Sequence, residues 1–216
     1  MEILTEQITN ARLGERVVTE AQLSRLLDGT PQRRYNLVNR ALHRGELLRL
    51  KRGRYLLSSA VQQGKMHPFV LAQALLPGSY ISMETALSFH GWIPESTPIT
   101  MSVTPHRRHQ TLDIPKFGQF RYYPLALNTG WFLEGVDRDT LAGQSCLMAQ
   151  PLRALLDIIC LRKIDYPGIR SLTEGMRIDE HELASIDKDD LERMRPVYQH
   201  KRMETCISAM QRELKQ

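Results

Sequence analysis

Over the first 45 residues, apolar residues recur at the spacing of α-helices, and turn signals interrupt this pattern. Segment 3–14 predicts a short helix that Gly14 can end. Thr19 can cap a second helix, because Gln22 stands three residues further on and completes a capping-box pattern. The Asp-Gly pair at 28–29 then indicates a turn.

A third helix is predicted to begin at Thr30-Pro31 and to end before Gly45. Thr is a favoured N-cap, Pro a favoured first helical residue, and Gly a favoured residue just past a helix end. One side of this helix is apolar, and Arg and Asn residues occupy the remainder. The apolar residues are Leu37, Val38, Ala41 and Leu42. Two short helices joined by a tight turn are typical of a helix-turn-helix.

The hydrophobic period changes from about 3.6 to 2 after Gly45. Apolar and basic residues alternate over 48–51, Arg52 and Gly53 give a turn signal, and a second strand continues to Leu57. This β-hairpin follows the helix-turn-helix directly. The sequence therefore predicts a winged helix-turn-helix DNA-binding domain over residues 1–60, in which the hairpin is the wing.

A linker is expected at 58–66, followed by a second domain over 67–216. Strands are expected at 80–81, 98–105 and 119–125, a polar loop at 106–118, and helices at 68–76, 82–90, 150–163, 179–194 and 200–216. Ser82 is the expected cap of the second of these helices. The fold class is thus α+β: an N-terminal winged helix-turn-helix, then a mixed α/β C-terminal domain with a small sheet and a helical C-terminus.

The net charge of +5 changes this picture when it is located along the chain. Residues 1–59 hold 11 Lys or Arg and 6 Asp or Glu, whereas the remaining residues hold 18 of each. Within 33–54 the ratio is eight to one. Such a concentration is typical of a nucleic-acid footprint and is poorly explained by solubility alone.

The basic residues fall into two sets on the predicted winged helix. Arg and Asn pair with guanine and adenine edges, so base contacts are expected from Gln32, Arg33, Arg34, Asn36, Asn39 and Arg40. Phosphate contacts ask only for cations and polar donors, and are expected from Thr30, Arg44, Arg49, Lys51, Arg52 and Arg54. The alternatives are a solvated helix face and a charged edge hairpin that resists aggregation. Tyr35 and Tyr55 fit either the core or a phosphate contact.

Outside this region the candidate chemistry is sparse. Arg107 and Arg108 form a second basic spot, a candidate for a phosphate or partner contact. The flanking imidazoles lack the partners of a metal site. His90 is expected to satisfy a hydrogen bond where a helix ends. The seam of Met203, Ile207, Met210 and Leu214 suits the core, with a dimer or partner contact as the alternative.

Several function classes lack their signatures. No phosphate-cradling glycine loop, Gly-x-Ser-x-Gly or metal-ligand cluster is present, so no catalytic residue, metal or cofactor is expected. No window approaches a membrane span, and residues 1–10 do not have the pattern of a signal peptide. Three scattered cysteines suit buried, reduced thiols. We therefore expect a cytoplasmic protein that is not an enzyme.

Three blocks of sequence, in order from Leu42 to Lys163, resemble one family. They are "LHRGELLRLKRGRYLL", "YISMETALSFHGWIPESTPITMSVT" and "AQPLRALLDIICLRK", similar to the AbiEi-type antitoxins of type IV toxin–antitoxin (abortive-infection) systems. The third block has Leu152 where the family pattern carries an acidic residue.

The resemblance implies an N-terminal DNA-binding domain and a C-terminal antitoxin domain. It implies a repressor that autoregulates its own operon in phage defence, and a nucleotidyltransferase-like toxin as partner. The DNA partner would be double-stranded operator DNA, expected to carry inverted repeats. The alternative function is a protein-interaction module whose basic hairpin docks an acidic partner without binding DNA.

Overall fold

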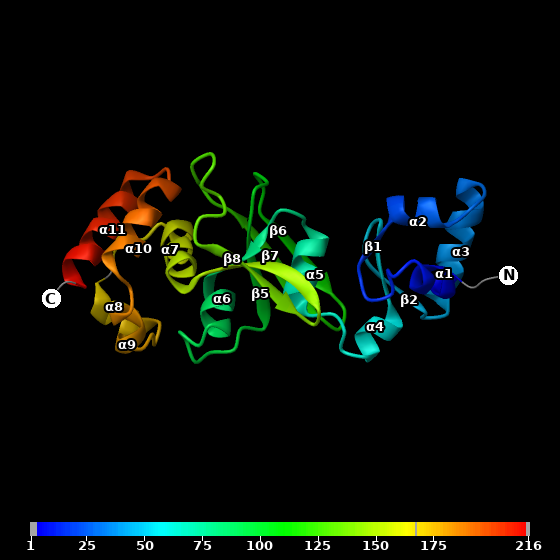
Figure 1. The fold of residues 1–216 in the computed structure, drawn as a ribbon, viewed down its shortest axis with the longest axis horizontal. Helices are drawn as coiled ribbons and strands as arrows, with labels where there is room; N and C mark the ends of the chain where they lie inside the picture. Colours follow the sequence, from blue (N-terminus) through cyan, green and yellow to red (C-terminus); the bar gives the residue numbers. More distant parts are fainter. Residues whose placement is uncertain (1–3, 167, 215–216) are drawn as a thin grey trace. The chain divides into compact units, whose positions relative to one another are not determined.

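The chain folds into two compact units in the computed structural model, which describes residues 4–166 and 168–214 (Figure 1). The first unit contains the described residues up to Pro77 together with Thr140–Ser145, and the second contains Gly78–Asp139 and the described residues from Cys146 onward. The architecture is mixed α+β. Residue 3 of the first predicted helix and residues 215–216 of the last one lie outside the described residues.

The first unit combines short helices with a three-stranded sheet. Its elements are α1 (Leu4–Asn10), β1 (Val18–Thr19), α2 (Glu20–Leu26), α3 (Pro31–His43), β2 (Leu47–Lys51), β3 (Arg54–Leu57), α4 (Ser58–Gln62) and α5 (Pro68–Leu75). The strand order is β1-β3-β2, and both pairs are antiparallel. Apolar residues from α1, α2, α3 and the sheet form one hydrophobic cluster.

The boundaries of α2 and α3 follow from local chemistry. Thr19 forms the predicted capping box with Gln22, and the Thr30 hydroxyl accepts the first-turn N–H of Arg33 at 3.3 Å. Gly45 has φ +68, and its N–H and that of the next residue bond to carbonyls in the last turn of α3. A helix end of this kind favours glycine, because a side chain is strained at that φ.

The predicted hairpin is present, but its alternation is broken. The register of β2 against β3 shifts between Arg49 and Lys51, so Leu47 and Leu50 are buried while Leu48 is half-buried. A bulge of this kind adds one residue to a strand and changes which side chains face the core.

The segment 58–66 is not the expected linker over its first half. Helix α4 occupies Ser58–Gln62, and Ala60 is buried. Its polar composition suggested a linker, whereas the Ser58 hydroxyl bonds to the carbonyl of Gly45 at 2.5 Å and fixes the start of the helix.

The second unit is built on a six-stranded sheet. Its elements are β4 (Tyr80–Ile81), α6 (Met83–Phe89), β5 (Ile99–Thr104), β6 (Gln110–Ile114), β7 (Gly118–Pro124), β8 (Val136–Leu141), β9 (Gln144–Ala149), α7 (Pro151–Arg162), α8 (Ile169–Gly175), α9 (Glu180–Ala184), α10 (Lys188–Met194), η1 (Arg195–Val197) and α11 (Lys201–Glu213). The strand order is β6-β7-β5-β4-β9-β8, and β5 runs parallel to β7 as β4 does to β9.

This sheet is larger than the small one predicted. Strand β6 lies inside the expected polar loop at 106–118, and neither β8 nor β9 was predicted. Strands β6 and β8 are the two edges of the sheet. Edge strands pair on one side only and often carry charged residues. Three charged residues stand in a row in β8, at 137–139, so its hydrophobic alternation is weak, whereas β6 alternates but stands within a polar segment.

The helices agree more closely with the predictions. Helix α7 is buried along most of its length, and Met203, Ile207 and Met210 of the α11 seam lie in the core. The helix predicted at 179–194 is instead two helices, because Asp187 caps a new start at α10. In the described part of the chain, no helix has both the length and the apolar character that a bilayer crossing requires.

Candidate nucleic-acid interface

Helix α3 presents its polar side to solvent. Gln32, Arg33, Asn36 and Arg40 are exposed, and Arg34 and Asn39 are half-buried. On the opposite side Val38 and Ala41 are buried in the hydrophobic cluster. The apolar side anchors the helix, so all six residues predicted to read bases belong to one continuous element with an accessible surface.

Hydrogen bonds orient these side chains but use only some of their N–H donors. The Gln32 amide nitrogen donates to the Asn36 side-chain oxygen at 3.2 Å, and Arg34 Nη1 donates to the carbonyl of Gly29 at 2.9 Å. Arg40 Nε donates to the carbonyl of Asn36 at 3.4 Å. A guanidinium has five N–H donors, so most of the donors of both arginines remain available to a ligand.

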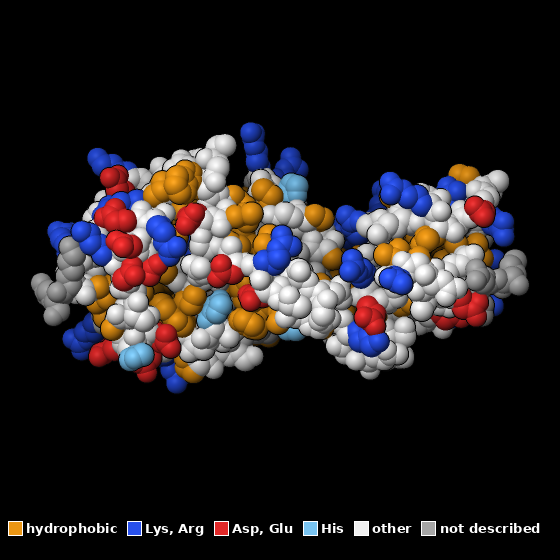
Figure 2. Space-filling view, in the orientation of Figure 1, with side chains coloured by type: hydrophobic (Ala, Val, Ile, Leu, Met, Phe, Trp, Pro, Cys, Tyr) orange, Lys and Arg blue, Asp and Glu red, His pale blue; other side chains and the backbone are white. Residues whose placement is uncertain are grey.

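The positive charge around α3 is barely compensated. Within the described ranges, Arg44 is the one Lys or Arg of segment 33–54 that forms an ion pair, and it does so with Glu46 at 3.9 Å. Figure 2 shows Lys and Arg side chains gathered over the part of this unit that carries α2 and α3. Unpaired cations on an exposed surface attract a polyanion.

The cations of the hairpin are not equivalent. Arg49 and Arg52 are exposed, and Arg54 is half-buried. Lys51 instead donates from Nζ to the carbonyl of Leu75, and burial, with the Arg54 charge, lowers the pKa of this lysine. Lys51 therefore braces the hairpin against α5, whereas Arg52 at the turn faces solvent.

The two tyrosines differ in a way that the sequence left open. Tyr35 is 63% exposed, whereas Tyr55 is 7% exposed and packs in the hydrophobic cluster. The Tyr55 hydroxyl donates to a Glu20 carboxylate oxygen at 3.4 Å, and burial together with that carboxylate raises its pKa. Tyr55 is a core residue, and Tyr35 is the one open to a ligand.

The second basic spot belongs to the other unit. Arg107 and Arg108 lie in the exposed connection between β5 and β6. His106 and His109 flank them, and the His109 ring packs on Tyr123 with centroids 4.8 Å apart. Among the described residues, no group of three or more His, Cys, Asp or Glu side chains is arranged to hold a metal ion.

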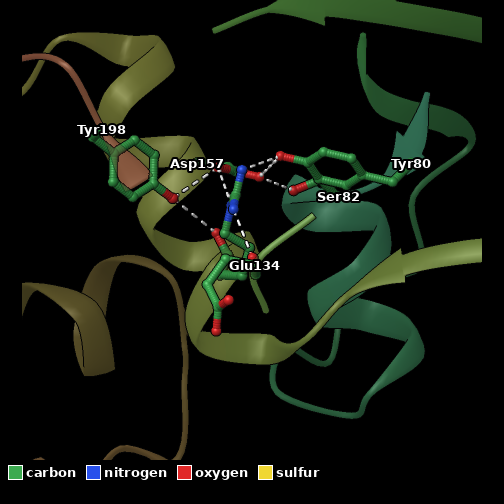
Figure 3. A network of polar contacts seen from close by, with 6 residues as sticks. Tyr80, Ser82, Glu134, Asp157 and Tyr198 are labelled. Carbon is green, nitrogen blue, oxygen red and sulfur yellow. Dashed lines mark hydrogen bonds and ion pairs between the residues drawn. The ribbon is translucent and has the colours of Figure 1, made fainter. Parts of the chain in front are cut away.

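A buried polar network in the second unit went unrecognised in the sequence. Arg153 and Asp157 of α7 are both 0% exposed, and Arg153 Nε donates to Asp157 Oδ1 at 2.9 Å. Figure 3 shows hydroxyl groups from other elements converging on this pair. The hydrophobicity of α7 predicted a buried helix but not that an ion pair would be buried with it.

Hydroxyl donors saturate the Asp157 carboxylate. Tyr80 and Ser82 donate to Oδ2 at 3.0 and 2.7 Å, and Tyr198 donates to Oδ1 at 2.8 Å. The other two nitrogens of Arg153 also find acceptors, since Nη2 donates to the Tyr80 hydroxyl at 2.6 Å and Nη1 to the Glu134 carbonyl at 2.7 Å. Buried charges persist only when they are paired and hydrogen-bonded in this manner.

The network changes the role of Ser82. This residue stands at the N-cap position of α6, as predicted, but its side chain makes no cap hydrogen bond and serves Asp157 instead. The next residue, Met83, is buried with φ +58, a strained conformation for a side chain other than glycine. Local strain at the start of α6 thus accompanies the bond to Asp157.

Burial sets the protonation of the network. It raises the pKa of Tyr80 and of Tyr198 well above the ordinary value, and the neighbouring Asp157 carboxylate raises both further. Burial disfavours the charged form of Arg153, but the Asp157 carboxylate together with Tyr198 and Tyr80 outweighs this effect, and the pKa of the guanidinium is raised. Both phenols therefore stay protonated as donors, and the Arg153 guanidinium stays charged.

The other polar residues of this region also hold the fold. His90 Nε2 lies 3.0 Å from the carbonyl of Ala149, which agrees with the predicted hydrogen bond at the helix end. Thr85 Oγ1 donates to the carbonyl of Ile99 and accepts the N–H of Met101, which fixes α6 to β5. The cysteines are buried and free, and burial raises the pKa of Cys206 to about 12.

The chain was also compared with models of known protein families and with curated proteins, and neither comparison found a match. The residues and geometry described above are therefore the basis for inferring a function.

We expect Asp157→Asn to lower the free energy of unfolding by about 3–5 kcal/mol, because it leaves the Arg153 guanidinium buried without its counter-charge. Urea denaturation of the full chain measures this. Asp113→Asn, on the edge strand β6, is the matched control and should change the free energy by less than about 0.5 kcal/mol. Equal effects of the two substitutions would show that the buried pair has no special role.

We also expect stability to fall steeply above about pH 10, where unfolded tyrosines ionise while Tyr80 and Tyr198 keep their protons. The folded pKa values are raised, so the stabilisation is present at lower pH and is lost as pH rises. In Tyr198→Phe the slope should be shallower by about 1.4 kcal/mol per pH unit. Denaturation at several alkaline pH values tests this, with Tyr35→Phe at the exposed ring as control; an unchanged slope in Tyr198→Phe refutes it.

Proposed function

We propose that the protein is a sequence-specific DNA-binding repressor whose first unit is a winged helix-turn-helix. The observation that carries the proposal is the exposed Arg and Asn side of α3, whose arginines form no ion pair within the described residues. Arg and Asn side chains match the donor and acceptor pattern of the major groove.

The order of elements supports this proposal. Helices α2 and α3 are joined by a short turn, and a hairpin of β2 and β3 follows α3 in the same sheet as β1. In winged helices the second helix of the motif enters the major groove and cationic groups around it contact phosphates. On this proposal α3 reads bases, and Arg49, Arg52 and Arg54 supply salt-dependent affinity.

We further propose that the repressor is the antitoxin of a type IV toxin–antitoxin system and acts in the cytoplasm by binding rather than by catalysis. The support is the family resemblance of three sequence blocks. The two later blocks supply the network partners Tyr80, Ser82, Arg153 and Asp157, which gives these segments a shared structural role. A nucleotidyltransferase-like toxin encoded beside this protein would support the assignment, and an unrelated neighbour would weaken it.

The decisive test is the combined variant Arg33→Ala, Arg34→Ala and Arg40→Ala. We expect it to weaken binding to the protein's own promoter by more than about 1–3 kcal/mol, the value for one good bidentate base contact. Fluorescence anisotropy with promoter and random duplexes measures affinity and specificity together.

The control for this test removes three cations elsewhere: Arg170→Ala, Arg177→Ala and Lys188→Ala, all exposed in the second unit. The control should bind the promoter like the unaltered protein. Equal promoter affinity in the α3 variant and the control would exclude α3 as the reading helix. Negligible binding of the unaltered protein to either duplex at low salt would favour the alternative of an acidic protein partner.

A second prediction separates the cations of the hairpin. Arg52→Ala should lower the slope of log affinity against log salt by about 0.9, the value for one lost phosphate contact. Lys51→Ala should lower the slope less, because the Lys51 ammonium already donates to the carbonyl of Leu75. Promoter titrations between low and moderate salt measure both slopes, and the reverse order would show that Lys51 leaves Leu75 to bind DNA.

A further inference from the structure

A hollow in the second unit lies beside the second basic spot and apart from the α3 surface. Its volume is about 550 Å³, within the range of sites that hold small ligands. Half-buried apolar residues, including Leu125, Leu127 and Phe132, form much of its wall. Arg107 contributes a cation and His106 an imidazole, and no acidic side chain is among the described residues that line it.

The charge beside the hollow is locally concentrated even though the domain is neutral. Segment 99–124, from β5 to β7, holds four Lys or Arg and one acidic residue, with His106 and His109 in addition. Segment 169–194 holds eight acidic residues and four Lys or Arg. In Figure 2 cationic and imidazole side chains project together above β6 and β7. The neutral total therefore conceals one basic surface and one acidic surface.

Aromatic side chains accompany these cations. Trp131, 39% exposed, lies between Gly130 and Phe132, which both line the hollow. The His109 ring packs on Tyr123 of β7. Base stacking on aromatic rings beside cations is how proteins hold unpaired strands.

We propose that this surface of the second unit, comprising the hollow, Arg107, Arg108 and Trp131, binds single-stranded nucleic acid. The apolar wall of the hollow receives one base, Trp131 stacks on a neighbouring base, and the two arginines neutralise phosphates. The proposal does not depend on operator recognition by α3, which belongs to the other unit.

The observations favour a single strand over duplex DNA. Phosphate contacts to a duplex need cations but neither a hollow nor an exposed ring, because paired bases are stacked on each other. An unpaired strand offers free base faces that match the apolar wall and Trp131. DNA and RNA strands share this chemistry, so the experiment includes both.

The test uses the full chain and labelled strands of about 12 nucleotides, a length typical of such sites. Oligo-dT and oligo-U are the two probes, and fluorescence anisotropy gives the affinity. The double variant Arg107→Ala and Arg108→Ala should lose two phosphate contacts and lower the salt slope by about 1.4, at about 0.7 for each contact. Trp131→Ala should weaken binding by about 5- to 150-fold, the effect of one lost stack.

Intrinsic fluorescence gives an independent readout. The chain has two tryptophans, and Trp92 is 6% exposed whereas Trp131 is 39% exposed. Stacking of a base should quench the emission of Trp131 and leave that of Trp92. In Trp131→Phe the quenching should disappear, while a phenylalanine ring preserves part of the affinity.

Matched variants keep this result separate from the function of α3. Arg170→Ala with Arg177→Ala removes the same charge from exposed positions of the same unit and should bind strands normally. The α3 triple variant should lose promoter binding and keep strand binding, and the loop double variant should do the reverse. An unchanged urea midpoint in each variant excludes unfolding.

Three results would overturn the proposal. The first is strand affinity in the loop double variant equal to that of the Arg170 and Arg177 control. The second is competition by random duplex as strong as by unlabelled single strand, which would make the loop a duplex phosphate contact. The third is equal competition by polyglutamate, which would make the surface a dock for acidic proteins.

Discussion

The second unit depends on burying an Arg–Asp pair completely. Arg153 and Asp157 lie one turn apart on α7 with 0% exposure, so any group that failed to meet them would leave a charge in an apolar interior. A buried charge without its partner lowers the free energy of unfolding by more than most single contacts contribute to it. The positions of β4, the start of α6 and Tyr198 are therefore coupled, because each supplies a donor that the carboxylate requires.

The first unit differs from the second, because its distinctive charged residues lie at the surface rather than in the interior. Its core is a compact apolar cluster, and the residues that we propose to contact DNA lie outside it. The bond from Lys51 to the carbonyl of Leu75 illustrates how a charge count overstates a binding surface. A cation that braces two elements contributes to the same net charge as one that faces solvent.

Local signals in the sequence located α2, α3 and the hairpin of the first unit, but they missed α4 and several strands of the second unit. The capping box at Thr19, the N-cap at Thr30 and the turn at Gly45 depend on neighbours within a few residues, and the structure has all three. Strand β8 escaped prediction because its run of charged residues obscures the alternation, and β6 because it is short and stands within a polar segment. The partners of Asp157 and the hollow beside Arg107 escaped because chain folding alone brings their residues together.

The distance along the chain between the network partners bears on the order of events during synthesis. Tyr80 precedes Asp157 by 77 residues, and Tyr198 follows it by 41. Contacts of such separation close slowly, and the carboxylate lacks its last donor until Tyr198 has left the ribosome. The buried residues of the first unit's hydrophobic cluster extend no further along the chain than Leu57. They are therefore all synthesised long before Tyr198. We expect the nascent chain to pass through a stage in which the basic first unit is folded. The segment that follows it is then still unfolded, carries the charges of Arg153 and Asp157, and is a target for chaperone binding.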